Sequence, residues 1–293
     1  MNRLGFVCGF LAAAIWGGLY VASRYVLDVV PPITLVALRY VIALAVLGGA
    51  MVISRARPVP KRDWPALALL GFIGFGISII AQFAGTRLAG AANGALITSI
   101  TPALVVGFAA LLLGEPITGR GLGGLLIGDL FLVVATISWA LYSVLAKRSS
   151  ASYPVLTVTT YAAFFGLLFT APLVPLEWAL VGRPDLAHLS PLIIGAILYI
   201  GVISTAGAFY LWNKGMALLD ANAAAGLFFA QPLVGASLGW LLLRETLITA
   251  TFVGGALILI GVLLASLTAP AIVLAPTAAT ASVQRAPNPV QRD

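Results

Sequence analysis

The chain has 293 residues, of which 61% are hydrophobic and only 9% are charged, and its net charge is +7. A soluble globular chain is about half apolar and about a quarter charged, so a water-soluble fold of this length could not bury so much apolar surface. The positive charge does not indicate a nucleic-acid partner, because the sequence has no basic stripe interleaved with aromatic residues. The single cysteine, Cys8, excludes a disulfide framework. The composition predicts a protein that lies in a lipid bilayer.

The apolar residues fall into runs that are long enough for helical spans of about 20 residues. The runs cover roughly residues 5–27, 32–54, 65–87, 91–113, 125–146, 154–176, 190–213, 221–243 and 249–269. Short loops separate them, so consecutive helices should run antiparallel. Residues 270–293 are rich in Ala, Pro, Thr and Gln, which predicts a disordered tail. The expected fold is an all-α polytopic membrane protein.

The two halves of the chain, residues 1–124 and 125–269, repeat the same spacings. The matching pairs are Trp16–Arg24 with Trp139–Lys147, eight residues apart in both, and Pro102–Glu115 with Pro232–Glu245, thirteen apart in both. Each Pro-to-Glu interval also contains a run of three leucines just before its end. The simpler alternative is a pair of unrelated proline-kinked helices that end in glutamate. We interpret the match as an internal repeat.

The first half is shorter at its end. After Gly255 the second half continues for about three further helical turns, whereas the first half passes from the equivalent Gly124 directly into Leu125, which opens the next repeat. We therefore expect ten spans in the native protein, nine of them visible here, with the fifth helix truncated. Consecutive α-carbons lie about 3.8 Å apart, so a missing segment predicts a wider gap between Gly124 and Leu125. The alternative is an unbroken nine-helix chain.

Charge placement agrees with ten spans. The positive-inside rule expects Lys and Arg in cytoplasmic loops. With ten spans and a cytoplasmic N-terminus, Arg57, Lys147 and Lys214 all fall on the cytoplasmic side. Both termini are then cytoplasmic, and two five-helix halves have opposite orientations, which is the inverted repeat common in secondary transporters.

The chain resembles the drug/metabolite transporter superfamily, in particular its EamA-type exporters. The resemblance rests on Ile15-Trp16-Gly17-Gly18, on its counterpart Ser138-Trp139-Ala140-Leu141-Tyr142, and on the two Pro-to-Glu spans. It implies a secondary transporter of the bacterial inner membrane that exports small molecules by alternating access, with a substrate cavity between the halves. Within the superfamily the chain looks most like exporters of aromatic amino acids and of methyl viologen. The truncated fifth helix departs from the family pattern.

Candidate substrate-binding residues are polar or aromatic side chains inside the apolar spans. Several share a helical face, as Thr205, Phe209 and Trp212 do. The full set is Trp16, Tyr20, Arg39, Ser78, Gln82, Trp139, Tyr142, Phe209, Trp212, Phe228 and Gln231. Together they predict an aromatic-lined cavity with a few hydrogen-bonding groups. The alternative is that they form interfacial belts or helix contacts.

Arg39 and two prolines carry more specific hypotheses. Arg39 lies about two turns into its span with no carboxylate nearby in the sequence, so it either meets a substrate carboxylate or binds carbonyls of a neighbouring helix. Pro102 and Pro232 interrupt the backbone ladder at equivalent positions, which predicts paired hinges.

The acidic residues lie in loops or at span ends, and the single histidine, His188, lies in a loop. Proton relays need carboxylates or histidines inside spans, so we favour gradient-driven export over obligatory proton antiport. The sequence offers no metal-binding cluster, no Ser/His pair at membrane depth and no phosphate-binding loop, so neither an enzyme nor a cofactor is expected. The predicted substrate is an aromatic or hydrophobic amino acid. The alternatives are a flat organic cation such as methyl viologen, or a membrane subunit without transport activity. No feature assigns an oligomeric state.

Overall fold

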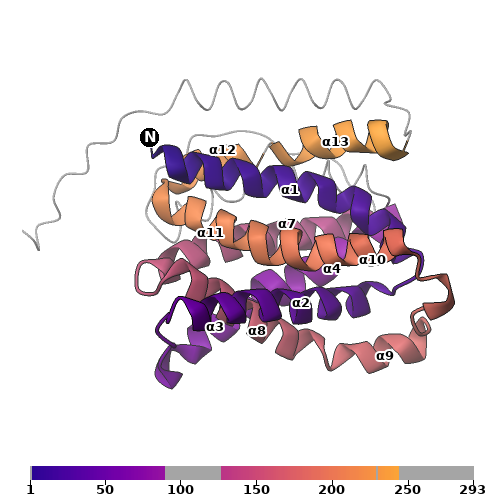
Figure 1. Cartoon of the computed structure of the whole chain (residues 1–293), viewed down its shortest axis with the longest axis horizontal. Coiled ribbons are helices and arrows are strands. Elements are labelled where there is room, and N and C mark those ends of the chain that lie inside the picture. Colours follow the sequence, from indigo (N-terminus) through magenta and orange to yellow (C-terminus); the bar gives the residue numbers. More distant parts are fainter. Residues whose placement is uncertain (1, 90–126, 229, 244–293) are drawn as a thin grey trace, which may run out of the picture.

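The computed structural model describes residues 2–89, 127–228 and 230–243, and these residues form helices with no strand among them. The main elements are α1 (Arg3–Leu27), α2 (Pro32–Ile53), α3 (Trp64–Gly71), η2 (Phe72–Ile77), α4 (Ser78–Ala89), α7 (Ile127–Ser150), α8 (Val155–Thr170), α9 (Leu173–Leu180), α10 (Pro191–Leu198), η4 (Tyr199–Gly207), α11 (Ala208–Leu218), α12 (Ala221–Leu227) and α13 (Ala230–Leu243). Two short 3-10 turns, η1 (Lys61–Asp63) and η3 (Leu186–His188), precede α3 and α10. The helices pack as one bundle (Figure 1).

The described helices confirm the prediction of a polytopic membrane protein. By length and composition, four continuous helical stretches could cross a membrane: Arg3–Leu27, Pro32–Ile53, Lys61–Gly85 and Pro191–Leu218. The bent pair α8 and α9 adds a fifth if it forms one broken span. Large apolar side chains such as Val41, Leu168 and Leu192 are exposed on the outside of the bundle, as expected where lipid is the solvent.

Two predicted spans are interrupted. The helix expected over residues 154–176 ends at Thr170 and resumes at Leu173 with a bend of 44°. Pro172 lies in this break and lacks the N–H that would continue the ladder. The helix expected over residues 221–243 is divided into α12 and α13. The predicted spans 91–113 and 249–269, the tail from residue 270, and the expected gap between Gly124 and Leu125 lie outside the described residues.

Contacts between connections define two ends of the bundle. At one end, which we call the basic end, Tyr153 donates to Asp63, and the hydroxyl of Thr157 lies 3.5 Å from the carbonyl oxygen of Arg57. At the opposite end, which we call the far end, the N–H of Asp185 donates to the carbonyl of Val29 at 3.0 Å. The α2–α3 and α7–α8 connections therefore lie at the basic end, and the α1–α2 and α9–α10 connections lie at the far end.

The directions of the helices follow from these ends. The stretch Pro191–Leu218 starts at the far end, so α11 ends at the basic end. Gly5, at the start of α1, lies against Leu218 and Leu219 at the end of α11, so α1 also begins at the basic end. By contrast, α7 begins at the far end, beside the end of α4, and finishes at the basic end. The same reversal relates α2 to α8 and the third span, residues 61–89, to residues 191–218. Equivalent described helices of the two halves thus run in opposite directions, as predicted for an inverted repeat.

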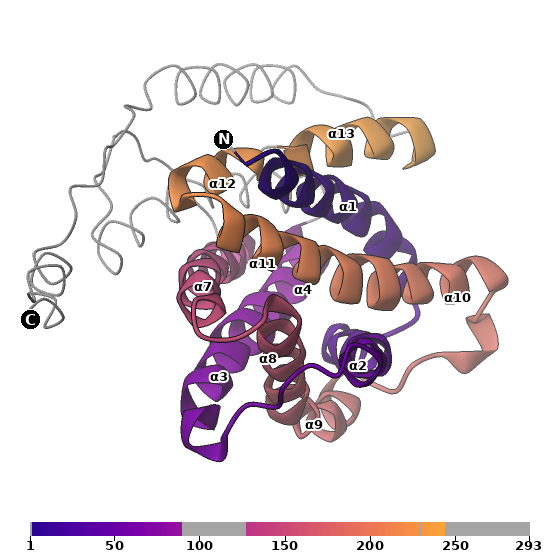
Figure 2. The same ribbon diagram turned by 60° about the vertical axis from the view of Figure 1, so that its left-hand side comes forward.

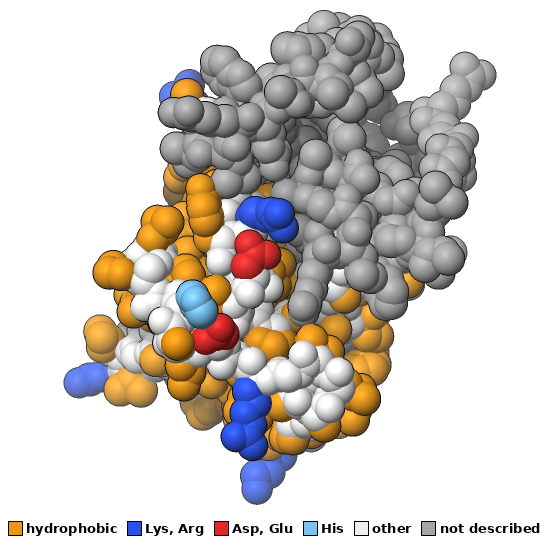
Figure 3. Space-filling view, turned by 90° about the vertical axis from the view of Figure 1, so that its right-hand side faces the viewer, with side chains coloured by type: hydrophobic (Ala, Val, Ile, Leu, Met, Phe, Trp, Pro, Cys, Tyr) orange, Lys and Arg blue, Asp and Glu red, His pale blue; other side chains and the backbone are white. Residues whose placement is uncertain are grey.

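Charge is unequal between the two ends. The basic end carries Arg55, Arg57, Lys61, Arg62, Lys147 and Arg148. The far end shows only scattered charged side chains among apolar and polar ones (Figure 3). There Asp185 pairs with His188 at 2.7 Å, and this hydrogen bond lowers the pKa of the Asp185 carboxyl. Lys147 lies at the same end as Arg57, as ten spans require and as nine consecutive spans would forbid.

Close helix contacts depend on glycine. α1 lies between α11 and α13 (Figure 2). A methyl group added at Gly17 would come within 2.7 Å of both the carbonyl oxygen of Gln231 and Cβ of Val234 on α13. Small residues at such positions let membrane helices approach closely. Gly48 on α2, by contrast, has no atom within 4 Å of its added Cβ.

We expect Gly17→Ala to lower the thermal unfolding temperature in detergent, because overpacking against backbone costs about 1–3 kcal/mol. Gly48→Ala is the matched control and should leave the temperature unchanged or raise it slightly, since alanine favours a helix. Size-exclusion chromatography after stepwise heating measures both. Equal melting of Gly17→Ala and Gly48→Ala would contradict this packing of α1 on α13.

A carboxylate from the second half caps a helix of the first half. Glu177 on α9 is 5% exposed, and its two oxygens accept hydrogen bonds from the N–H groups of Ile33 and Thr34 and from the Thr34 hydroxyl, each at 2.7 Å. These N–H groups lie in the first turn of α2, where the helix lacks internal partners and its dipole favours an anion. Glu177 therefore joins the two halves at the far end.

Glu177→Ala should destabilise the protein by about 1–2 kcal/mol, the usual cost of losing a cap, and should lower the unfolding temperature by several degrees. Asp28→Ala serves as the control. Asp28 has an exposed side chain, 3.8 Å from Arg24, and an exposed pair of this kind contributes little. If both variants unfold at the same temperature, the capping role of Glu177 is wrong.

Candidate functional site

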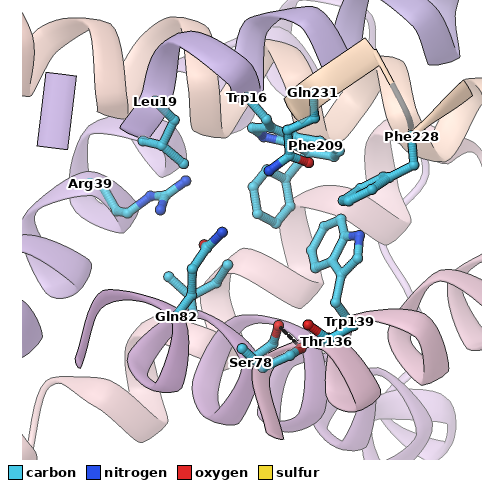
Figure 4. Close-up of a pocket in the computed structure, with 12 residues that line it drawn as sticks. Trp16, Leu19, Arg39, Ser78, Gln82, Thr136, Trp139, Phe209, Phe228 and Gln231 are labelled. Carbon is cyan, nitrogen blue, oxygen red and sulfur yellow. Dashed lines mark hydrogen bonds between the residues drawn. The ribbon is translucent and has the colours of Figure 1, made fainter. Parts of the chain in front are cut away.

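A cavity lies near the centre of the bundle, between helices of both halves (Figure 4). Its lining side chains come from α1, α2, α4, α7, α11, α13 and the residue that follows α12. They are Trp16, Leu19, Arg39, Ser78, Ile79, Gln82, Ala135, Thr136, Trp139, Phe209, Phe228 and Gln231. The free volume of the cavity is about 30 Å³. In this conformation the cavity has room for water but not for an amino acid.

Aromatic rings form much of the wall. The ring of Trp16 lies 5.1 Å from that of Trp139 and 5.4 Å from that of Phe209, both nearly perpendicular, and 5.9 Å from that of Phe228. Edge-to-face pairs at such distances are favourable, each contributing about 1 kcal/mol. The rings come from α1, α7, α11 and the chain just before α13, so they also hold the two halves together.

The two tryptophans differ in hydrogen bonding. Trp16 is 4% exposed and its Nε1 donates to the carbonyl of Ser204 at 2.9 Å. Trp139 is 7% exposed, and its Nε1 has no hydrogen-bond partner among the described residues. A buried donor without a partner costs about 1–3 kcal/mol, so this indole N–H is available to a ligand.

Arg39 lies fully buried at the edge of the cavity. Its Nε donates to the hydroxyl of Thr205 at 2.7 Å, while Nη1 and Nη2 have no partner within the described residues. The guanidinium carbon lies 5.3 Å from the ring centre of Phe83 and 5.7 Å from that of Phe209. Cation–π contacts at these distances offset part of the cost of burying the charge. Among the described residues, Arg39 forms no ion pair.

A small polar cluster stands across from the rings. The amide nitrogens of Gln82 and Gln231 each donate to the Tyr20 hydroxyl at 3.0 Å. The amide oxygen of Gln231 is buried without a partner in the described part of the chain. In Figure 4 the side chains of Arg39, Gln82 and Gln231 point into the open space, with Trp139 and Phe228 on its other side. Arg39 therefore faces Trp139 and Phe228 across the cavity.

The structure places most of the predicted residues around this cavity. Those that line it are Trp16, Arg39, Ser78, Gln82, Trp139, Phe209, Phe228 and Gln231. Ser78 on α4 also donates to the carbonyl of Ala135 on α7 at 2.8 Å. The sequence analysis did not identify Leu19, Ile79, Ala135 or Thr136 as lining residues. Aliphatic and small side chains are common throughout the spans, so composition does not distinguish those that face a cavity.

Three predicted residues lie behind the lining. Tyr20 holds the two glutamine amides, as described above. The Tyr142 hydroxyl accepts from Nδ2 of Asn213 at 2.7 Å, and Nε1 of Trp212 donates to the hydroxyl of Ser143 at 3.0 Å. Tyr142 and Trp212 are fully buried and support Trp139 and Trp16 through ring contacts at 4.8 Å and 5.6 Å.

Only one of the two predicted hinge residues lies in the described part of the chain. Pro232 lies in α13, and its partner Pro102 lies outside the described residues. The hinge stays a prediction.

Several relatives match this chain over most of its length. It is 25% identical to an "Uncharacterized transporter" of Archaeoglobus fulgidus over 86% of this chain and 95% of the relative. It is 26% identical to "Protein PecM" of Dickeya dadantii, covering 84% and 86% of the two chains. It is also 27% identical to a "Probable terminal-alkyne amino-acid exporter" of Streptantibioticus cattleyicolor, covering 76% and 79%.

A crystal structure with 24% sequence identity superposes with a TM-score of 0.69 over 91% of this chain and 98% of the other, which shows a shared fold. The EamA-like transporter family matches residues 3–128 and, a second time, residues 126–267. The two matches cover nearly all of the chain up to residue 267 and coincide with a bundle of oppositely directed halves around a central cavity. The chain belongs to the EamA-like transporter family.

Proposed function

We propose that this transporter exports small amphipathic metabolites, in particular aromatic or hydrophobic amino acids, by alternating access. The observation that carries the proposal is that a buried cation and aromatic rings face each other across the central cavity. Arg39 brings the buried positive charge to one side, and Trp139 and Phe228 lie on the other. A molecule with a carboxylate at one end and an apolar ring at the other matches this arrangement.

Unpaired polar atoms specify the chemistry further. Nη1 and Nη2 of Arg39 and Nε1 of Trp139 are donors without partners among the described residues, and Oε1 of Gln231 is an acceptor without one. A carboxylate can accept two parallel hydrogen bonds from a guanidinium. An ammonium group can donate to the free amide oxygen of Gln231. A zwitterionic amino acid supplies both groups, and its ring can stack in the aromatic wall. The name of the Streptantibioticus relative, an amino-acid exporter, supports the same class.

Export of a flat organic cation is the alternative. Rings such as those of Trp16 and Phe209 attract cations, and a viologen is flat enough to lie against them. The charge of Arg39 opposes this alternative, because a like charge nearby is unfavourable. No acidic side chain lines the described cavity to offset it.

Transport requires the cavity to open. The room at its centre is too small for an amino acid, and contacts join the halves at both ends of the bundle: Tyr153 with Asp63 at the basic end, and Glu177 with α2 at the far end. We propose that the halves rock so that one end opens at a time, as in other inverted-repeat transporters, with Pro102 and Pro232 as hinges. No carboxylate lines the described cavity, which supports gradient-driven export over obligatory proton antiport.

Substrate selectivity tests the proposal. In proteoliposomes loaded for counterflow, phenylalanine should be transported, and phenylalanine amide, which lacks the carboxylate, should require roughly 10- to 100-fold higher concentrations, since hydrogen bonds to charged groups contribute about 1.5–3 kcal/mol. Arg39→Gln should weaken phenylalanine transport by a similar factor and leave phenylalanine amide nearly unaffected. Arg57→Gln, an exposed loop variant, is the control.

Two results would count against this assignment. One is transport of methyl viologen with no transport of phenylalanine, which would favour the cation alternative. The other is phenylalanine transport that Arg39→Gln and Trp139→Ala both leave intact, in protein that elutes as a single peak on size exclusion.

We further propose that the protein lies in the bacterial plasma membrane with the basic end and both termini in the cytoplasm. The support is the positive-inside rule applied to the unequal charge of the two ends. In a Cys8→Ser background, Arg183→Cys in the α9–α10 connection should react with a membrane-impermeant maleimide in intact cells. Arg62→Cys in the α2–α3 connection should react only after lysis. The reverse labelling pattern would invert the proposed orientation.

A further inference from the structure

The segment η4 (Tyr199–Gly207) joins the second half to two cavity side chains of the first half. It is a π-helical stretch between α10 and α11. Successive residues of this segment bind the first half: the carbonyl of Ser204 accepts from Trp16 Nε1, and the hydroxyl of Thr205 accepts from Arg39 Nε. π-helical turns are rare, and they occur mostly at functional sites. This one lies where the second half meets the cavity.

The hydrogen bonds of Thr205 fix which role its hydroxyl takes. Its Oγ1 donates to the carbonyl of Ile200, five residues earlier, at 2.5 Å. A threonine hydroxyl has one hydrogen to donate and can accept with its remaining lone pairs. Because the hydrogen is committed to Ile200, the oxygen can only accept from Arg39, whose Nε can only donate. The pair is complementary and leaves no ambiguity in direction.

This bond orients the whole guanidinium group. The group is planar, so fixing Nε and the side chain's direction also fixes the directions of Nη1 and Nη2. The rings of Phe83 and Phe209 lie 5.3 Å and 5.7 Å from the guanidinium carbon. Thr205 thus accepts from Nε, and Nη1 and Nη2 form the terminal pair of nitrogens. The terminal pair remains unsatisfied and points into the cavity (Figure 4).

We infer that Thr205 is a positioning residue that sets the selectivity of the cavity for carboxylates, an inference that rests on the proposed function. Thr205 does not line the cavity and touches no substrate; it acts through Arg39. With its hydroxyl present, the guanidinium presents two parallel donors to a carboxylate. Without it, Nε seeks another acceptor, the group rotates, and the terminal pair no longer faces the substrate. The π-helical turn that presents Thr205 is then part of the recognition site.

Selectivity between phenylalanine and phenylalanine amide is the readout, because a purely structural role would change transport of both. Thr205→Val keeps the shape of the side chain and removes the hydroxyl. It should raise the KM for phenylalanine about 10-fold, the loss expected when a charge-assisted hydrogen bond is misplaced, while the KM for phenylalanine amide changes less than about twofold. Thr205→Ser keeps the hydroxyl and should restore most of the discrimination.

Thr160→Val is the matched control. The hydroxyl of Thr160 donates within its own helix to the carbonyl of Leu156 at 2.7 Å, so its removal should change neither KM. If Thr205→Val does not fold, Thr205→Ala provides the same test with a smaller side chain. Folding of each variant is checked by size exclusion before reconstitution.

The outcomes separate the two claims. If the wild-type protein transports phenylalanine and its amide equally well, the proposed function fails and the role of Thr205 fails with it. If Arg39→Gln abolishes the discrimination but Thr205→Val retains it, the proposed function stands and the positioning role of Thr205 is overturned. Loss of discrimination in Thr205→Val, with recovery in Thr205→Ser, supports the inference.

Discussion

A guanidinium group inside a membrane helix costs about 3 kcal/mol or more unless the protein supplies partners for it, and the surroundings of Arg39 follow from that cost. The protein satisfies Nε with Thr205 and places the faces of Phe83 and Phe209 near the charge. It supplies no carboxylate partner from the described residues. Nη1 and Nη2 therefore lack hydrogen-bond partners among the described residues. The carboxylate of the proposed substrate would supply an acceptor for both nitrogens.

The inverted repeat places the supporting contacts in pairs. Each third span contains a π-helical segment, η2 in the first half and η4 in the second. Each third span also bonds to the first helix of the other half: Ser78 Oγ donates to Ala135 on α7, and Trp16 Nε1 on α1 donates to Ser204. These reciprocal contacts lie beside the cavity, since Ser78, Ala135 and Trp16 all line it. A rocking motion of the halves would change both contacts together, which links the orientation of Arg39 and Trp16 to the conformation of the whole transporter.

Further contacts join the two halves at the basic end and at the far end. At the basic end, Tyr153 donates to Asp63, and this hydrogen bond raises the pKa of the phenol. The N–H of Val59 lies 3.3 Å from the hydroxyl of Tyr161 at the same end. At the far end Glu177 caps α2 across the boundary between the halves. In the proposed alternating access, opening at the far end would break the Glu177 contacts and opening at the basic end would break the contacts around Tyr153, so the two ends can be tested separately.

The sequence alone predicted an all-α membrane protein and the opposite directions of the two halves, because hydropathy and charge are local properties of the chain. It also identified many lining residues, since Arg39 or Gln82 stands out in an apolar span. It did not predict the break at Pro172 or the division of residues 221–243 into α12 and α13. Tertiary structure decided the rest. Thr205 meets Arg39 across 166 positions, Tyr142 and Trp212 stand behind the cavity, and Leu19 and Ala135 face it. Which side chains face inward depends on the rotation of each helix about its own axis. That rotation is set by packing between distant segments, such as Gly17 against α13. It therefore cannot be predicted from a local stretch of sequence.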